Sequence, residues 1–258
     1  MKIISSAYQL ASIAETLGDL CKLNPEWKED KIRSKTGIDV HYIKHDSEST
    51  ETMAVSAAKK IISKIDKKSI DGLIYVTQSP SSTIPTRACL MQDILGLKQN
   101  LFAFDINQGC SGFVYGLSVA AGLSQVTDAG RILIICTETY SCYTSKSDRS
   151  TRPIFSDGAA AVLVDFEKDA KINPFVFSTD GSGAKYLTLI EKEKLNTTDN
   201  PALYHDGANV LKFVINKIPI AVESLLEKSH LTKTDIDLFV FHQASAVVLE
   251  RLRKKLNI

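Results

Sequence analysis

Hydrophobic and polar positions along the chain predict strands that alternate with helices. Short apolar runs bounded by polar residues indicate buried strands, and apolar residues spaced three and four apart indicate helices. Because strands and helices alternate, we expect an α/β architecture with a mixed or mostly parallel sheet. The expected strands are 71–79, 101–106, 131–139 and 235–243, with two short strands around the Asp157-Gly158 turn. The expected helices are 47–65, 86–95, 111–124, 209–228 and 245–256.

Composition and charge narrow the classes of protein that fit. The chain has 258 residues, 44% of them hydrophobic and 24% charged, which is enough for one large domain or two small ones. The net charge is +1, so electrostatics gives no reason to expect nucleic acid or an anionic membrane as a partner. The sequence has no apolar run of transmembrane length and no signal-peptide pattern at its N-terminus. We therefore expect a cytoplasmic protein.

The cysteines argue against a disulfide framework and against a zinc site. There are five, an odd number, and no two are spaced as a Cys-x-x-Cys pair. Most are expected to be small buried hydrophobic residues, as Cys136 is in the run RILIICTET. No metal site is predicted.

Cys110 has a different setting, in the stretch LFAFDINQGCSGFVYGL. It lies between an expected strand and an apolar helix, with Gly109 before it and Gly112 after it. At a helix N-terminus the macrodipole and the free backbone N–H groups favour a thiolate. The same N–H groups could hold an oxyanion. A nucleophile is one interpretation, and a buried cysteine at a strand-to-helix turn is the other.

His242 ends the expected strand 235–243 and comes before a helix, much as Cys110 does after 101–106. In open α/β sheets, ligands bind outside the carboxyl ends of strands. We therefore predict that Cys110 and His242 face one cleft. There the imidazole could transfer a proton or donate a hydrogen bond to a developing oxyanion. The alternative is a histidine that merely caps the following helix.

Several motifs together resemble one enzyme family. The segments DINQGCSGFVYGL, IFSDGAAAVLV and FVFHQAS, in this order, are similar to those of the 3-oxoacyl-acyl-carrier-protein synthase III enzymes (ketoacyl synthase III) of the thiolase-like superfamily. RSKTGIDVHYI and TIPTRACLMQDILGL extend the resemblance over nearly the whole chain. It implies a thiolase-like fold of two similar βαβαβ halves in five layers, and a homodimer. We place the nucleophile half at 1–165 and the histidine half, which we expect to be incomplete in this chain, at 166–258.

The resemblance also implies a reaction. An acyl group passes from acyl-coenzyme A to Cys110, and a malonyl group on acyl carrier protein then loses carbon dioxide. The resulting enolate, stabilised by His242, attacks the thioester in fatty-acid or related biosynthesis. No permanently bound cofactor is expected. The family's third catalytic residue, an asparagine, lies several dozen residues beyond the histidine and thus past Ile258.

Further residues match substrate-binding positions of the family. Arg149 corresponds to an arginine that contacts the nucleotide end of coenzyme A. Lys35 stands where the family often has an arginine, and Ser245 replaces the asparagine of its HQAN motif. Ile84 lies where a residue of the partner subunit often closes the acyl pocket. Two other functions stay open: acyl transfer without condensation, and a non-catalytic binding partner.

Overall fold

The computed structural model describes residues 1–166, 173–190 and 203–258, which form two compact units. The first unit comprises Met1–Ile13, Tyr42–Thr139 and Ser156–Asn173. The second unit comprises Ala14–His41, Tyr140–Phe155 and Pro174–Ile258. Both units take segments from the range 1–165, and the division into halves at 165/166 stays a prediction.

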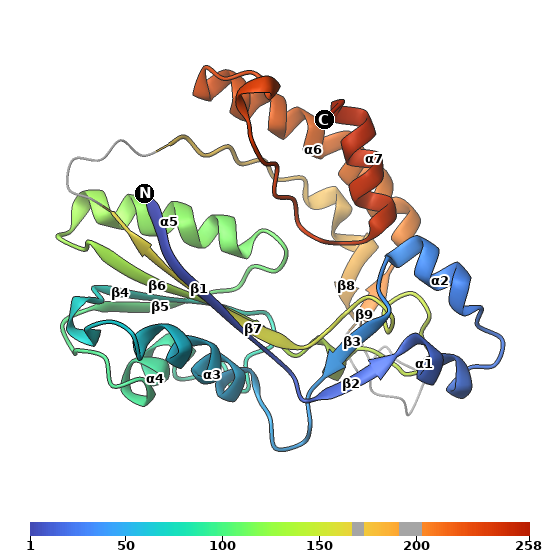
Figure 1. Cartoon of the computed structure of the whole chain (residues 1–258), viewed down its shortest axis with the longest axis horizontal. Helices are drawn as coiled ribbons and strands as arrows, with labels where there is room; N and C mark the ends of the chain where they lie inside the picture. The colour runs from blue at the N-terminus through green and yellow to red at the C-terminus, as the bar shows by residue number, and fades with distance from the viewer. Residues whose placement is uncertain (167–172, 191–202) are drawn as a thin grey trace. The chain divides into compact units, whose positions relative to one another are not determined.

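A mixed five-stranded sheet forms the centre of the first unit (Figure 1). Its order is β1-β7-β6-β4-β5, in which β4 runs parallel to β5 and β6, and β7 runs antiparallel to β6 and β1. This confirms the predicted α/β class with a mixed sheet. The edge strand β1 was not predicted from the sequence. The strands are β1 (Lys2–Leu10), β4 (Gly72–Val76), β5 (Phe102–Ile106), β6 (Arg131–Glu138) and β7 (Gly158–Asp165).

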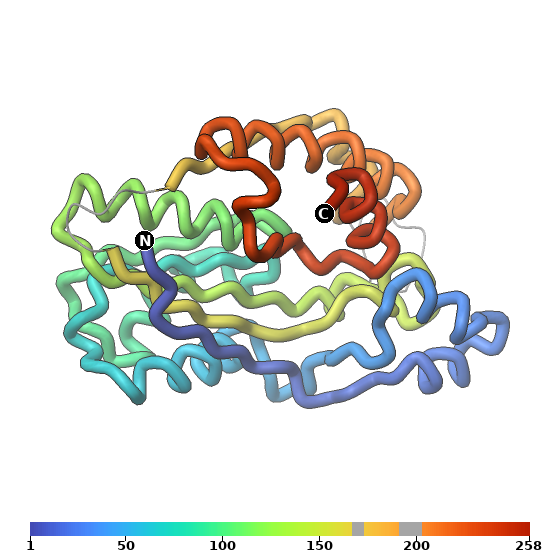
Figure 2. The backbone as a smooth tube through the Cα atoms, turned by 45° about the horizontal axis from the view of Figure 1, so that its top comes forward, coloured from blue at the N-terminus to red at the C-terminus, as the bar shows by residue number. Residues whose placement is uncertain are grey.

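Helices cover both faces of this sheet. In Figure 2, α3 (Thr50–Ile62) and α4 (Arg87–Ile94) lie on one face, and α5 (Gly112–Val126) lies on the other. Strands covered on both faces are apolar throughout rather than alternating, which is the pattern of β4 and β6. Their side chains Ile74, Tyr75 and Leu133 are completely buried. Burying one such apolar side chain contributes about 1.5–3 kcal/mol to stability.

The second unit is built mainly of helices. The long helix α6 (Gly207–Ser229) packs against α7 (Ala246–Leu256), and α7 also contacts α2 (Glu29–Thr36). This unit also contains α1 (Leu17–Leu23), the strand pair β8 (Leu187–Leu189) with β9 (Leu203–His205), and short 3-10 helices at Tyr140–Tyr143, Gly181–Tyr186 and Lys233–Asp235. The paired strands β2 (Ile13–Thr16) and β3 (Val40–Ile43) each have residues in both units, and a 3-10 helix at Lys67–Ser69 belongs to the first unit. In the described ranges, no helix is both long and apolar enough to cross a membrane.

The five predicted helices are confirmed as α3, α4, α5, α6 and α7, with ends that differ by a few residues. The predicted strand 235–243 is wrong, because 236–245 has no regular secondary structure. A strand exists only when a neighbour accepts its hydrogen bonds, and none of the described strands pairs with this segment. Its side chains Leu238 and Val240 are 75% and 81% exposed.

One of the two strands predicted around Asp157-Gly158 is also absent. The segment before Asp157 forms a turn, in which the N–H groups of Ile154 and Phe155 donate to the carbonyl oxygen of Thr151 at 3.0 and 3.2 Å. Only the segment from Gly158 onward pairs in the sheet, as β7. The apolar residues Ile154 and Phe155 led to the prediction of a strand, but their backbone hydrogen bonds are those of a helical turn.

Candidate active site

Cys110 lies in the turn between the end of β5 and the start of α5, as predicted, and it is exposed. The turn is closed by a 2.8 Å hydrogen bond from the N–H of Gly112 to the carbonyl oxygen of Gly109. The N-cap residue Ser111 makes no side-chain capping bond to the helix. Its hydroxyl instead donates to Oε1 of Gln108 at 3.3 Å. The N–H groups that follow Gly112 in the first turn of α5 are therefore not satisfied by the side chain of the N-cap, which suits them to bind an oxyanion.

Gly112 is the residue that lets α5 start so close to the sheet. A methyl group at Gly112 would lie 2.4 Å from Cγ1 of Val76, the last residue of β4. Only glycine avoids this clash without a shift of the helix or the strand. Since Cys110 is two residues earlier, the contact between Gly112 and Val76 fixes the position of the candidate nucleophile on the sheet.

Glu138, at the end of β6, is a part of this site that the sequence analysis missed. Its carboxylate accepts hydrogen bonds from the N–H of Gln78 at 2.8 Å and from Oγ of Ser79 at 2.5 Å. Burial raises the pKa of this carboxyl above its ordinary value. The available signal was an acidic residue at the end of β6, after the apolar run 132–136.

The electrostatics at Cys110 differ from the expectation of a stabilised thiolate. Burial of the sulfur raises the pKa of the Cys110 thiol, and the charge of Glu138 adds to the rise. These effects outweigh a backbone hydrogen bond that lowers this pKa, although the residue as a whole keeps an exposed surface. The thiol form of Cys110 is therefore favoured at neutral pH.

His242 belongs to the second unit and lies in the irregular segment that leads into α7. Its carbonyl oxygen accepts a 3.0 Å hydrogen bond from the N–H of Ala244, which turns the chain toward the helix. His242 as a whole is exposed, but partial burial of the imidazole lowers its pKa, so the neutral form is favoured at pH 7. A neutral imidazole can still donate one hydrogen bond.

Ser245 is the N-cap of α7. Its Oγ accepts a 3.3 Å hydrogen bond from the N–H of Val248. The substrate contact expected for Ser245 stays a prediction. The start of α7 is packed against the end of α2, where a methyl group at Gly37 would lie 2.9 Å from Cβ of Ala246. Lys35, exposed on the last turn of α2, is thereby brought to the side of the second unit where α7 begins.

Arg149 is exposed in the loop 144–155 of the second unit, which two anchors hold to the segment 14–41. Nδ2 of Asn24 donates to the carbonyl oxygen of Lys146 at 3.1 Å. The buried guanidinium of Arg152 pairs with both carboxylate oxygens of Glu15, at 2.8 and 3.1 Å. This loop is therefore a fixed platform for Arg149.

Glu15 also lies 2.7 Å from Nε2 of the buried His41. Burial by itself would raise the pKa of the Glu15 carboxyl, but its close contacts with His41 and Arg152 lower it to about 2. Sequence analysis missed this trio, because Glu15 and Arg152 are far apart in the chain and neither belongs to a motif.

Ile84 belongs to the first unit and is 83% exposed, at the tip of the loop between β4 and α4. The base of this loop is tied down by Ser81, whose Oγ donates to Glu51 at 2.6 Å and accepts from Arg87 at 3.2 Å. The candidate residues thus fall into two groups: Cys110 and Ile84 in the first unit, and Lys35, Arg149, His242 and Ser245 in the second. A shared cleft for Cys110 and His242 stays a prediction.

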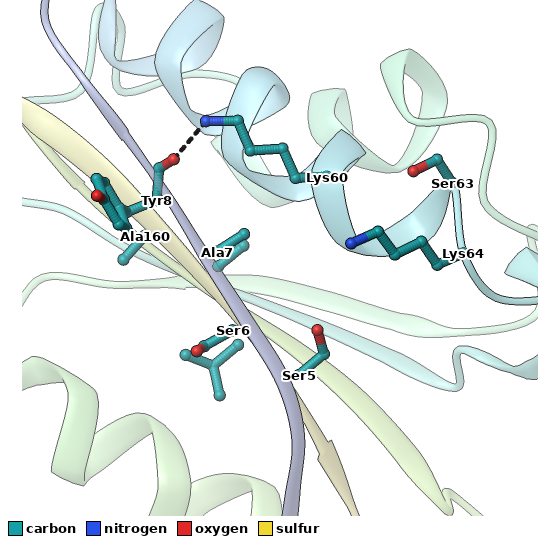
Figure 3. Close-up of a pocket in the computed structure, with 10 residues that line it drawn as sticks. Ser5, Ser6, Ala7, Tyr8, Lys60, Ser63, Lys64 and Ala160 are labelled. Carbon is teal, nitrogen blue, oxygen red and sulfur yellow. Dashed lines mark hydrogen bonds between the residues drawn. The ribbon is translucent and has the colours of Figure 1, made fainter.

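A surface pocket of the first unit contains none of these residues. Figure 3 shows it along β1 and α3, where Nζ of Lys60 donates to the carbonyl oxygen of Tyr8 at 2.6 Å. Because β1 and β5 are opposite edges of the sheet, this pocket is remote from the turn that carries Cys110. Among the residues that the structure describes, no group of His, Cys, Asp and Glu could hold a metal ion.

Comparison with solved structures assigns the class of fold. A crystal structure of a 3-oxoacyl-(acyl-carrier-protein) synthase III matches with a TM-score of 0.92 and 35% identity, covering 99% of this chain and 82% of that one. The synthase III from Aquifex aeolicus VF5 matches with a TM-score of 0.88 and 29% identity, over 100% of this chain and 81% of that one. The fold is therefore that of the thiolase-like enzymes.

Comparison of sequences assigns the family. The family model described as 3-oxoacyl-[acyl-carrier-protein (ACP)] synthase III matches residues 104–181. The beta-ketoacyl-[acyl-carrier-protein] synthase III of Bacillus pumilus (strain SAFR-032) is 34% identical over 90% of this chain and 73% of its own length. That of Coxiella burnetii (strain RSA 493 / Nine Mile phase I) is 33% identical over 97% and 77%. This chain belongs to the beta-ketoacyl-acyl-carrier-protein synthase III family.

Proposed function

We propose that this chain is the condensing enzyme its family membership implies: an acyltransferase of fatty-acid or related biosynthesis that uses acyl-coenzyme A and malonyl-acyl carrier protein. The observation that carries the proposal is the position of Cys110, exposed at the start of α5 beside N–H groups that its N-cap side chain does not satisfy. A thiol in this position can form a thioester, whose oxyanion intermediate the helix N–H groups stabilise.

The first step transfers the acyl group. The sulfur of Cys110 loses its proton and attacks the acyl carbonyl carbon, and the carbon–sulfur bond to coenzyme A breaks. The coenzyme A sulfur leaves with the electron pair and takes up a proton. Since burial favours the neutral thiol of Cys110, this proton has to be removed as the substrate reacts.

The second step forms the carbon–carbon bond. The malonyl group on the carrier protein loses carbon dioxide, and the electron pair of the broken bond forms an enolate. The enolate carbon attacks the thioester carbonyl, and Cys110 leaves as the thiolate and regains a proton. His242, whose lowered pKa favours neutral imidazole, donates a hydrogen bond to the enolate oxygen.

Substrate binding is assigned to both units. The exposed cations Arg149 and Lys35 suit the phosphate groups of coenzyme A. Ser245, whose hydroxyl caps α7, acts by fixing the start of that helix next to His242. Ile84 is exposed and apolar, which suits a residue that closes an acyl pocket of a partner subunit.

The direct test is covalent labelling of Cys110. Incubation with a panel of short straight and branched acyl-coenzyme A compounds is expected to add one acyl mass per chain, as measured by intact-mass spectrometry. Cys110→Ala should remove the adduct completely, because it removes the sulfur that is proposed to carry the acyl group. Cys89→Ala, which removes another exposed cysteine, is the matched control and should label normally. An adduct that survives Cys110→Ala, or no adduct with any compound, would contradict the proposal.

A homodimer through β5 is part of the proposal. Among the described strands only β4 pairs with β5, so the outer edge of β5 has open backbone donors and acceptors. The strand FAFDI has no lysine or proline to prevent pairing with another strand, and its residues Phe102 and Phe104 stack at 6.0 Å. Two such edges pair across a two-fold axis in the commonest symmetry of oligomers.

Phe104→Lys should therefore convert the dimer to a monomer, because two lysines would face each other across the axis. Sedimentation equilibrium measures the mass of each form. Val126→Lys places the same charge at an exposed apolar position at the end of α5 and should stay dimeric. A monomeric wild type, or a Phe104→Lys variant that stays dimeric, would refute pairing through β5.

A cytoplasmic location is the last part of the proposal. All five cysteines are free, which suits a reducing compartment. The proposed substrates also place the enzyme where acyl-coenzyme A is made and used.

A further inference from the structure

A chain of contacts leads from Glu138 to Cys110 within the first unit. Glu138 ends β6, and its carboxylate holds the loop that follows β4 through the N–H of Gln78 and Oγ of Ser79. The same Ser79 Oγ accepts a 2.8 Å hydrogen bond from the N–H of Thr139. These hydrogen bonds join the loop after β4 to the end of β6. Two residues before Gln78, Val76 packs against Gly112 at the start of α5.

Glu138 is also the charged group that acts on the Cys110 sulfur. Around Glu138, the loop after β4 presents the neutral side chains of Thr77 and Ser79, and β7 places Gly158 opposite it in the register. The titratable groups that feel its charge are the thiols of Cys110 and of Cys136 on its own strand. In the described residues of this unit, no cation pairs with Glu138, so its charge is not neutralised locally.

We propose that Glu138 is a positioning residue for Cys110, which braces the loop under the start of α5 and sets a negative charge that opposes ionisation of the sulfur in the resting enzyme. The proposal rests on Cys110 being the nucleophile of the reaction described above. A resting thiol reacts slowly with adventitious electrophiles and oxidants, because the thiolate is the reactive form. The proton of the Cys110 thiol then has to be removed once the substrate is bound.

The test measures how fast iodoacetamide alkylates Cys110 as a function of pH, by mass spectrometry of the peptide that contains it. Glu138→Gln keeps the size of the side chain and one acceptor oxygen, and it removes the charge. We expect the midpoint of the alkylation profile to move to lower pH, with a rate at pH 7 that is about three- to tenfold higher. The alkylation rate of the exposed Cys89 in the same sample is the internal reference.

Two further variants separate charge from bracing. Ser79→Ala removes one hydrogen bond of the brace, while the carboxylate of Glu138 keeps its bond from the N–H of Gln78. The melting temperature should therefore fall, while the alkylation midpoint moves much less than in Glu138→Gln. Asp165→Asn removes a carboxylate that pairs with Arg131 at 2.9 Å, at the opposite end of β6, and should leave the midpoint unchanged.

The proposal is overturned if the Glu138→Gln profile superimposes on that of the wild type in a folded protein. It is equally overturned if Ser79→Ala or Asp165→Asn moves the midpoint as far as Glu138→Gln does. Since iodoacetamide requires no acyl-coenzyme A site, these outcomes are independent of whether the chain is acylated. Failure of acyl labelling with an intact pH shift would reject the proposed function alone.

Discussion

Replacing His242 with alanine is expected to abolish carbon dioxide release from malonyl-acyl carrier protein while acylation of Cys110 continues. The imidazole acts on the enolate that forms only in the second step, and loss of such a group lowers the rate by about 10²–10⁴-fold. Burial lowers the pKa of His242, so wild-type activity should extend to pH values below the ordinary histidine range before protonation reduces it. Released radiolabelled carbon dioxide measures the second step, and intact mass measures the first.

Two variants control this experiment. Gln243→Ala changes the exposed neighbouring residue, whose amide donates to the carbonyl oxygen of Phe241, and should keep most of the activity. His242→Asn retains a hydrogen-bond donor but no titratable group, so partial activity would indicate that donation suffices. Condensation by His242→Ala at nearly the wild-type rate would contradict the role of this histidine. Acyl transfer by the wild type without any carbon dioxide release would favour the alternative of a transferase that does not condense.

The second large effect is on stability. Glu15→Ala leaves the buried Arg152 without its carboxylate partner, and breaking a buried pair from one side costs about 3–5 kcal/mol. We expect a loss of this size in the free energy of unfolding, measured by urea denaturation at pH 7. The loop 144–155 should also loosen, because the pair of Arg152 with Glu15 anchors it.

The pH dependence gives a further check on this pair. The pKa of Glu15 is lowered from 4.5 to about 2 in the folded protein, so the unfolded chain binds a proton at this site more readily than the folded one. Its stabilising contribution is fully present above pH 4.5 and is lost as the pH falls toward 2. The difference in the free energy of unfolding between wild type and Glu15→Ala should therefore become smaller as the pH falls from 4.5 to 2.

An exposed ion pair is the matched control for Glu15. Glu29→Ala removes the i,i+4 partner of Arg33 on α2, where both side chains are substantially exposed. Such surface pairs contribute up to about 1 kcal/mol. Equal losses of unfolding free energy for Glu15→Ala and Glu29→Ala would contradict the stabilising role of the buried pair. A loss for Glu15→Ala that does not change with pH would contradict it as well.

Local pattern was enough to predict the first unit in outline. The strands 101–106 and 131–139 and the helices 86–95 and 111–124 were found because burial on both faces leaves an apolar run, and burial on one side leaves a helical period. The motif around Cys110 identified the turn that carries the candidate nucleophile. Its glycine spacing is readable in the sequence, whereas the steric reason for Gly112 is a tertiary contact with Val76 of β4.

The same reasoning failed where a structure depends on a partner far along the chain. The run 235–243 has a strand-like composition, but no described strand accepts its hydrogen bonds. The edge strand β1 went unnoticed because its exposed Ile3 and Tyr8 give it no clear alternation. Composition indicates whether side chains tend to be buried. Strand pairing additionally requires a second segment in register with the first.

By itself, the sequence determined the family, the turn that carries the candidate nucleophile and the places of the five long helices, because each of these is encoded within short stretches of neighbouring residues. Only the tertiary structure decided the electrostatics of the site. It joined Glu138 to Ser79 and Glu15 to Arg152, pairs that are 59 and 137 positions apart. The strand order β1-β7-β6-β4-β5 differs from the order along the chain. Residues at the ends of adjacent strands therefore become neighbours only after the sheet has formed. Burial in that assembled interior, rather than any local pattern, then raises the pKa of the Cys110 thiol.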